Sequence, residues 1–241
     1  MMFLLRSLIF YTFFFVGCIL FSAITLVLKP FMPTRAHMRR CYRMGMSGLR
    51  QSSWLLGIDY VVEGEIPEQP VVYASNHQSA WETFFLPDLL SPIAIGVKRE
   101  LLWIPVMGQA LLALHAHGIN RAKGGLVMRK MAAWGQRMQR AGVNILIFPE
   151  GTRYPAGTIG PFLPGAAMLS KRTGMPLVPV ALDSGAYFHP RTFKKNPGTI
   201  RVVIGEPIDP AQHETREMTN MAREWITETM SLEQVRRMKK R

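Results

Sequence analysis

The chain opens with one long apolar run, and short apolar blocks follow it. The segment from Ser7 to Leu28 carries no charge and is almost wholly apolar. As a helix it would span roughly 33 Å at about 1.5 Å per residue, close to the ~30 Å of a hydrocarbon core. A cleaved signal peptide usually has a shorter apolar region and a small-x-small cleavage site, whereas Lys29-Pro30-Phe31-Met32 follows here. The run therefore predicts a membrane-associated helix that either crosses the bilayer or reclines in one leaflet.

Basic residues after this run predict a second helix. Lys29 and five arginines lie between positions 29 and 50, against Arg6 alone before the run, so the positive-inside rule places the rest of the chain in the cytoplasm. The pattern from Arg35 to Trp54 is amphipathic, with arginines at 35, 39 and 43 beside an apolar face of Met38, Tyr42, Met46 and Leu49. Such a helix either packs on the folded domain with a solvated basic face or lies on anionic lipid, and we favour the lipid interpretation.

From residue 57 onward, short apolar blocks predict an α/β domain. Two helix candidates, Leu126–Arg140 and Ala166–Thr173, end just before a glycine, and a third amphipathic pattern runs from Met218 to Ile226. The alternation of strands with helices predicts a mostly parallel central sheet flanked by helices. We expect residues 1–56 to form N-terminal membrane-associated helices and residues 57–241 the α/β domain. The strand candidates are Tyr60–Glu63, Val71–Ala74, Ile93–Val97, Ile145–Phe148, Leu177–Leu182 and Ile200–Ile204.

The formal net charge of +13 and a pI near 10.3 require an acidic partner. Anionic lipid, an acidic carrier protein and nucleic acid all meet that requirement. The basic residues gather beside the apolar run and no nucleic-acid recognition motif is present, so we expect an anionic membrane surface and no nucleic acid. Cys18 and Cys41 show neither a disulfide framework nor zinc-type spacing. His115 and His117 lack a nearby acid or cysteine, so we expect no metal and no cofactor.

Polar, ionisable residues follow two of the predicted strands. Asn76-His77-Gln-Ser-Ala-Trp-Glu82 comes after the first, and Phe148-Pro-Glu150-Gly-Thr-Arg153 after the second. Open α/β sheets bind ligands at the carboxyl ends of their strands, so these segments predict a site. The first offers a base and a carboxylate, and the second adds a guanidinium suited to an anionic substrate.

His77 can act as a general base near neutral pH if a carboxylate orients its ring. On a regular helix the five-residue offset to Glu82 would separate the two side chains by about 140°. They can meet only if His77 lies in the turn before the helix, which is where the sequence places it. A serine nucleophile is disfavoured, because the chain has no strand-turn Gly-x-Ser-x-Gly motif around Ser75 or Ser79.

Further blocks extend this pattern in a fixed order along the chain. They are Lys98-Arg-Glu100-Leu101 with Pro105, Gly108 and Asn120-Arg121, then the Phe148–Arg153 segment, and then Val178-Pro179-Val180. Over roughly residues 58–210 the sequence resembles the glycerolipid acyltransferase family, specifically its bacterial 1-acylglycerol-3-phosphate acyltransferases. The resemblance implies a glycerol-3-phosphate acyltransferase-like fold at the cytoplasmic side of a bacterial inner membrane. It also implies acyl transfer from acyl carrier protein or coenzyme A to a lysolipid hydroxyl, forming phosphatidate without a covalent acyl-enzyme.

The same resemblance assigns roles to individual residues. His77 would be the base and Glu82 its partner. Lys98, Arg121 and Arg153 would hold the acceptor phosphate, with Gly151 and Thr152 shaping the loop. Glu150 would either position an arginine or bind the acceptor hydroxyl.

The sequence departs from the family pattern at two places. The family's usual partner of the histidine is aspartate, and Glu82 stands there, with a reach about one methylene longer. A lysine often found near the equivalent of Leu163-Pro164 is absent. The second departure leaves another acceptor open, such as a lyso-ornithine lipid, and a non-catalytic basic membrane adaptor is the alternative from a different class.

Overall fold

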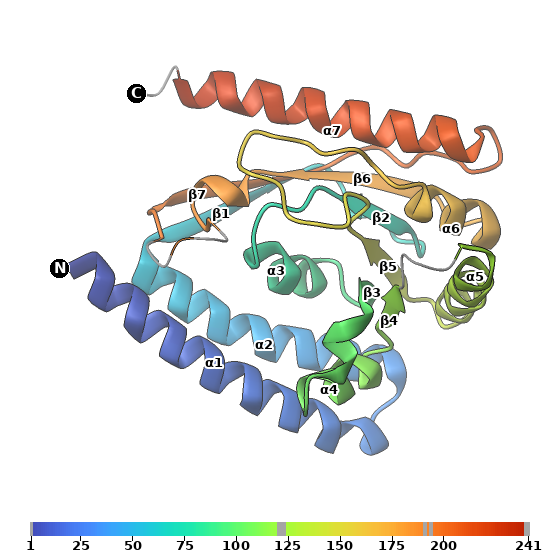
Figure 1. Cartoon of the computed structure of the whole chain (residues 1–241). Coiled ribbons are helices and arrows are strands. Elements are labelled where there is room, and N and C mark those ends of the chain that lie inside the picture. The colour runs from blue at the N-terminus through green and yellow to red at the C-terminus, as the bar shows by residue number, and fades with distance from the viewer. Residues whose placement is uncertain (1, 120–123, 190–191, 193–194, 239–241) are drawn as a thin grey trace.

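The computed structural model describes residues 2–119, 124–189, 192 and 195–238, with side chains for all of these except 2–8, 46–55, 124–127 and 232–238. Two long helices come first: α1, Met2–Leu28, and α2, Thr34–Leu56, joined by the short 3-10 helix η1, Lys29–Phe31. They lie side by side along their length (Figure 1). The predicted apolar and amphipathic helices are both confirmed. Among the described residues, Ile9–Phe31 is the segment long and apolar enough to cross a membrane.

The central sheet has seven strands in the order β1-β7-β6-β2-β5-β3-β4. Neighbouring strands are parallel except β6 and β7, which confirms the predicted mostly parallel sheet. β2, β5 and β6 are buried along their whole length, which is why they read as continuous apolar runs. The strands are β1 Ile58–Glu63, β2 Val72–Ser75, β3 Ile93–Lys98, β4 His117–Ile119, β5 Asn144–Ile147, β6 Leu177–Leu182 and β7 Gly198–Ile204.

Helices cover both faces of this sheet. α6 and α7 pack on one face, and α2 and α3 pack on the other, with α1 outside α2 (Figure 1). The remaining helices are α3 Trp81–Leu89, η2 Arg99–Trp103, α4 Met107–Ala113, α5 Gly124–Arg140, α6 Gly165–Thr173, η3 Ser184–Ala186 and α7 Thr215–Met238. The hydrophobic pattern did not single out η1, α3, η2, α4, β4 or η3, although the spacing of His77 and Glu82 implied a helix at α3.

His115 and His117 lie in different local environments. His117 lies in β4 and its ring stacks on Trp134 with 5.0 Å between ring centroids. His115 precedes the strand with a positive φ of 58°, and its Nε2 lies 2.9 Å from Lys29 Nζ. Each imidazole is thus in contact with a different neighbour.

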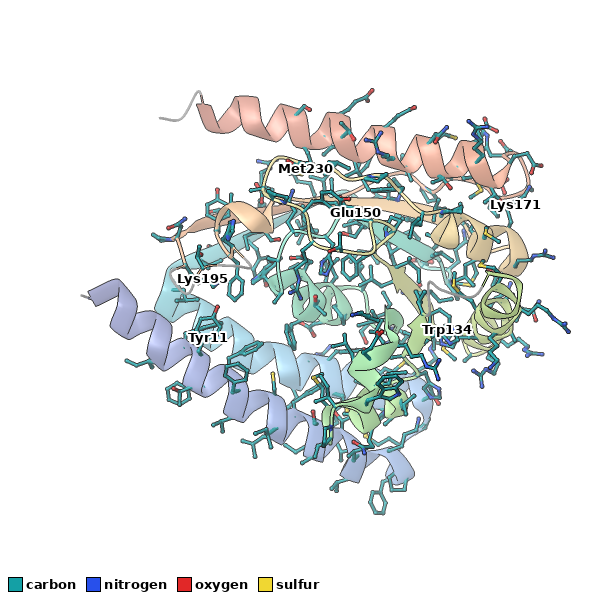
Figure 2. The ribbon with its side chains drawn as sticks, viewed as in Figure 1. Tyr11, Trp134, Glu150, Lys171, Lys195 and Met230 are labelled. Atoms are coloured by element: carbon teal, nitrogen blue, oxygen red, sulfur yellow. The ribbon has the colours of Figure 1, made fainter. Side chains whose placement is uncertain are left out.

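The first helix is part of the hydrophobic core. Phe10 is fully buried, and its ring meets that of Phe188 at 5.6 Å between centroids. Four residues later along α1, Phe14 meets Phe84 of α3 at 5.1 Å. The buried Lys195 lies beside the contact between Phe10 and Phe188. Its ammonium is 4.5 Å from the ring centroid of Phe188 and 5.6 Å from the ring centroid of Tyr11 (Figure 2). α1 is therefore joined to the α/β part by aromatic packing.

α2 also packs inward. Met38 and Cys41 are fully buried and Tyr42 is largely buried, whereas the arginines at 35, 39, 40 and 43 are exposed. The helix therefore packs on the domain and presents a basic face outward, and contact of that face with anionic lipid remains a prediction.

We expect Phe10→Ala to lower the free energy of unfolding in detergent by about 3–5 kcal/mol, the usual cost of removing a buried phenylalanine side chain. The matched control is Phe13→Ala, because Phe13 lies on the same helix and is 67% exposed. It should change stability by no more than about 0.5 kcal/mol. Chemical denaturation of the detergent-solubilised protein measures both, and equal effects would show that α1 is not part of the core.

Candidate active site

The ends of β2 and β6 are fixed to each other by Asn76. Its side-chain amide donates to the carbonyl of Leu182 at 2.8 Å, and its side-chain oxygen accepts the N–H of the same residue at 2.9 Å. Asn76 is fully buried, so neither hydrogen bond competes with water. The turn that begins at His77 therefore starts from a fixed point.

His77 and Glu82 meet as the five-residue spacing predicts, with His77 in the turn before α3 and Glu82 in its first helical turn. Nδ1 of His77 lies 2.9 Å from Oε1 of Glu82. The His77 side chain is 14% exposed and that of Glu82 is fully buried. Because a carboxylate can only accept, Nδ1 carries the proton and Nε2 is left as the basic nitrogen.

The Glu82 carboxylate receives hydrogen bonds on both oxygens. Oε1 also accepts the backbone N–H groups of Gln78 at 2.7 Å and Ser79 at 2.6 Å. Oε2 accepts the hydroxyl of Ser184 at 2.6 Å and that of Ser79. Burial by itself would raise the pKa of Glu82, but the hydrogen bonds and the nearby imidazole outweigh it and lower the pKa. Glu82 is therefore a buried carboxylate held in its ionised form.

Glu150 holds the turn from the neighbouring strand β5. Its Oε2 accepts the backbone N–H of His77 at 2.6 Å, and its Oε1 accepts that of Gly160 at 2.7 Å. Burial raises the pKa of this carboxyl group, and the two backbone donors offset only part of the rise. In Figure 2 Glu150 lies in the interior, within the loop that follows β5. Its contacts fix the backbone of His77, and binding of substrate by Glu150 stays a prediction.

The imidazole is also held from its face. The ring of Phe148 stacks on that of His77, with 4.2 Å between centroids and 23° between planes. The carbonyl of His77 accepts the N–H of Tyr154 at 2.9 Å. Our strand assignment placed Phe148 inside a strand, but β5 ends at Ile147, so Phe148 lies in the loop.

Two residues of this site were missed by sequence reasoning. Ser184 is 102 residues from Glu82 and carries no motif, so only the position of β6 beside β2 could have indicated it. Ser79 was considered only as a nucleophile, whereas its hydroxyl donates to Glu82 and it is fully buried.

The predicted phosphate-binding residues that the structure describes follow strands at the same edge of the sheet. Lys98 ends β3, is exposed, and has its ammonium 3.9 Å from a carboxylate oxygen of Glu100. Gly151 takes a positive φ of 66° in the loop after β5, where Thr152 and Arg153 are exposed. β2, β5 and β3 are neighbours, and adjacent strands lie about 4.8 Å apart, so Lys98 and Arg153 follow strands close to the one that precedes His77. Arg121 lies outside the described residues.

Known proteins are similar to this chain in sequence and in fold. The model of the protein family described as Acyltransferase matches residues 57–183. The 1-acyl-sn-glycerol-3-phosphate acyltransferase of Pseudomonas aeruginosa is 36% identical over 236 residues, which are 94% of this chain and 91% of that protein. The alpha form from Mus musculus is 31% identical over 204 residues, 81% of this chain and 70% of that protein. The crystal structure of the 1-acyl-sn-glycerophosphate (LPA) acyltransferase PlsC from Thermotoga maritima matches 96% of this chain and 95% of its own, with a TM-score of 0.78 and 24% identity, which supports the fold.

Removing the Ser184 hydroxyl should weaken the site without removing either member of the His77–Glu82 pair. Loss of a hydrogen bond to a charged group costs about 1.5–3 kcal/mol, so we expect Ser184→Ala to be destabilised by that amount near neutral pH. Ser184→Thr keeps the hydroxyl and is the matched control. Denaturant unfolding in detergent measures both variants.

The pH dependence follows from the lowered pKa of Glu82. A carboxyl group whose pKa is lowered on folding stabilises the protein above its unfolded pKa, and that stabilisation is lost as the pH falls through the folded pKa. The stability gap between wild type and Ser184→Ala should thus be present above about pH 4.5 and close below it. A gap independent of pH would mean that Ser184 acts by packing alone.

Proposed function

Because this chain belongs to the acyltransferase family, we propose that it transfers a fatty acyl group from a thioester to the free hydroxyl of 1-acylglycerol-3-phosphate, forming phosphatidate. The proposal is supported by similarity to proteins named for this reaction. The similarity to the Pseudomonas aeruginosa protein extends over 94% of this chain. The observation that carries it is the His77–Glu82 pair, in which a fully buried, hydrogen-bonded carboxylate leaves Nε2 of a partly exposed imidazole as the base.

In the proposed reaction, Nε2 of His77 takes the proton of the acceptor hydroxyl while the hydroxyl oxygen attacks the thioester carbonyl. The carbon–oxygen bond forms, the carbon–sulfur bond breaks, and the departing thiolate receives the proton from the imidazolium. Glu82 stabilises the positive charge that His77 carries between these two steps. The acyl group passes directly to the acceptor, without an acyl-serine. The hydroxyls of Ser79 and Ser184 instead donate hydrogen bonds to the Glu82 carboxylate.

The acceptor phosphate is bound, in this proposal, by Lys98, Arg121 and Arg153, with Gly151 and Thr152 shaping the loop. Lys98 at the end of β3 and Arg153 in the loop after the neighbouring strand β5 are both exposed, so a phosphate can approach them from solvent. A guanidinium can hold two phosphate oxygens at once, which favours Arg153 as the orienting residue.

The donor is acyl carrier protein or acyl-coenzyme A, and the acceptor comes from a membrane. The apolar α1 supports membrane association, and the exposed arginines of α2 suit an anionic surface. We place the protein at the cytoplasmic side of a bacterial inner membrane, following the excess of basic residues after α1. A binding adaptor would have no use for an ionised carboxylate buried behind a histidine, since burying such a charge is costly.

Substitution of the pair should remove catalysis and leave the fold. We expect His77→Ala to lower kcat by about 10²–10⁴-fold, the usual contribution of a general base. Glu82→Gln should impair kcat strongly, because an amide cannot stabilise the imidazolium, whereas Glu82→Asp keeps the charge and should be milder. Rates with lysophosphatidate in detergent micelles, tested with both donors and with other lysolipids, measure these changes and identify the acceptor.

The chain provides a matched control for this experiment. His213, just before α7, and Glu217, in the first turn of α7, make a similar pair, with Nδ1 and Oε1 2.9 Å apart and an exposed carboxylate. His213→Ala should leave kcat unchanged. The role of His77 would be contradicted if His77→Ala kept more than a tenth of the wild-type activity. The role of Glu82 would be contradicted if Glu82→Gln had a higher kcat than Glu82→Asp.

Arg153→Ala should raise KM for the phosphorylated acceptor about ten- to a hundredfold, since losing a charge-assisted hydrogen bond costs about 1.5–3 kcal/mol. KM for the acyl donor should change far less. Arg172, exposed in the last turn of α6, is the matched control, and Arg172→Ala should alter neither constant. If Arg153→Ala changes both constants equally, Arg153 maintains the loop instead of binding phosphate.

A further inference from the structure

Exposed apolar side chains gather on two parts of the described chain. The first is the outer face of α1 with η1, where Phe13, Phe15 and Phe31 are each more than 60% exposed. The second is the η2–α4 surface, defined here as the exposed apolar residues from η2 through α4. Trp103 is 67% exposed and Leu112 54%, and the complete set is Leu101, Trp103, Ile104, Val106 and Leu112.

These two parts are neighbours in the fold. α4 packs against α1 (Figure 1). Lys29, directly after α1, has its ammonium 2.9 Å from Nε2 of His115, two residues beyond the end of α4. The η2–α4 surface therefore lies beside the last turns of α1 and extends the apolar face of that helix.

The polar residues of this surface fit a boundary between lipid and water. The guanidinium carbon of Arg99 lies 5.6 Å from the ring centroid of Trp103, and Lys98 and Arg99 are both exposed. Tryptophan is enriched where acyl chains meet headgroups, because its ring is apolar and its N–H is polar. Basic side chains at the same level attract anionic headgroups.

The backbone presents these residues at a local cost. Val106 has a positive φ of 65°, a backbone conformation that is strained for a β-branched residue. Two residues later, Gly108 lies so close to η2 that an added Cβ would be 2.1 Å from the carbonyl oxygen of Leu102. The tight turn between η2 and α4 is thus built into the fold, and its result is an apolar surface that faces outward.

We propose that the η2–α4 surface docks into the headgroup region of an anionic lipid bilayer, next to α1. η2 begins directly after Lys98, the last residue of β3, so docking brings the carboxyl edge of the sheet against the lipid. On the proposed function, an acceptor can then reach Lys98 with its acyl chain still in the bilayer. The docking itself does not depend on the acceptor or on catalysis.

Fluorescence quenching tests the position of Trp103 in the full-length protein. The protein is reconstituted into vesicles of phosphatidylcholine and phosphatidylglycerol, and the emission lost in Trp103→Phe is taken as that of Trp103. We expect lipids brominated on the acyl chain to quench the Trp103 emission. Aqueous acrylamide should quench this emission at least threefold less in the vesicle-bound protein than in the protein unfolded in denaturant without detergent. Trp225, partly exposed on α7 at the other face of the sheet, is the control, and the emission lost in Trp225→Phe should be insensitive to brominated lipid.

A matched pair of leucines gives a second measurement. Leu112 is 54% exposed, and Leu163, beside α7 residues Thr219 and Ala222, is 51% exposed. In a Cys18→Ser background, a fluorophore on Leu112→Cys should be quenched by brominated lipid, whereas one on Leu163→Cys should be quenched by aqueous iodide.

The proposal is overturned if Trp103 and position 112 are open to the aqueous quenchers and insensitive to brominated lipid. It is also overturned if both are shielded from acrylamide without quenching by brominated lipid, since a protein then covers the surface. Neither measurement reads activity. An inactive protein that gives the expected quenching would therefore refute the proposed reaction and leave the docking intact.

Discussion

The buried negative charge of Glu82 is the interaction on which the site depends. A fully buried carboxylate is tolerable only when hydrogen-bond donors surround it, and removing one partner of a buried ionic pair typically costs about 3–5 kcal/mol. The donors come from the turn after β2, which includes His77, and from Ser184 in η3, two residues after the end of β6. The sheet order and the start of α3 must therefore be correct before this charge can be accommodated.

A second carboxyl group supports the same turn, and its pKa is shifted in the opposite direction. Burial raises the pKa of Glu150, with a further contribution from repulsion by Glu82, whereas hydrogen bonds lower the pKa of Glu82. The two groups lie on either side of His77, one bonded to its ring and the other to its backbone. Helix α3 and the loop after β5 thus each supply one of the contacts that hold His77 in place.

Sequence patterns predicted those parts of the structure that depend on local periodicity. β6 has the predicted bounds, and His77 lies in the turn before α3 because a five-residue offset admits no other contact with Glu82. The reach of Ser184 across the sheet was not predictable, since it depends on which strands are neighbours. β4 has three residues and is too short for periodicity to detect, and the turn at Val106 adopts a backbone conformation that valine disfavours.

The aromatic contact between α1 and the loop after β6 has a practical consequence for protein production. A common way to obtain a soluble version of a membrane-anchored enzyme is to delete its first helix. Here the deletion would uncover Phe84 and Phe188, whose rings pack on α1, and Phe188 is only four residues from the hydroxyl that binds Glu82. A shortened gene product would therefore lose part of its core along with its anchor, so biochemical work on this protein calls for the intact chain in detergent or lipid.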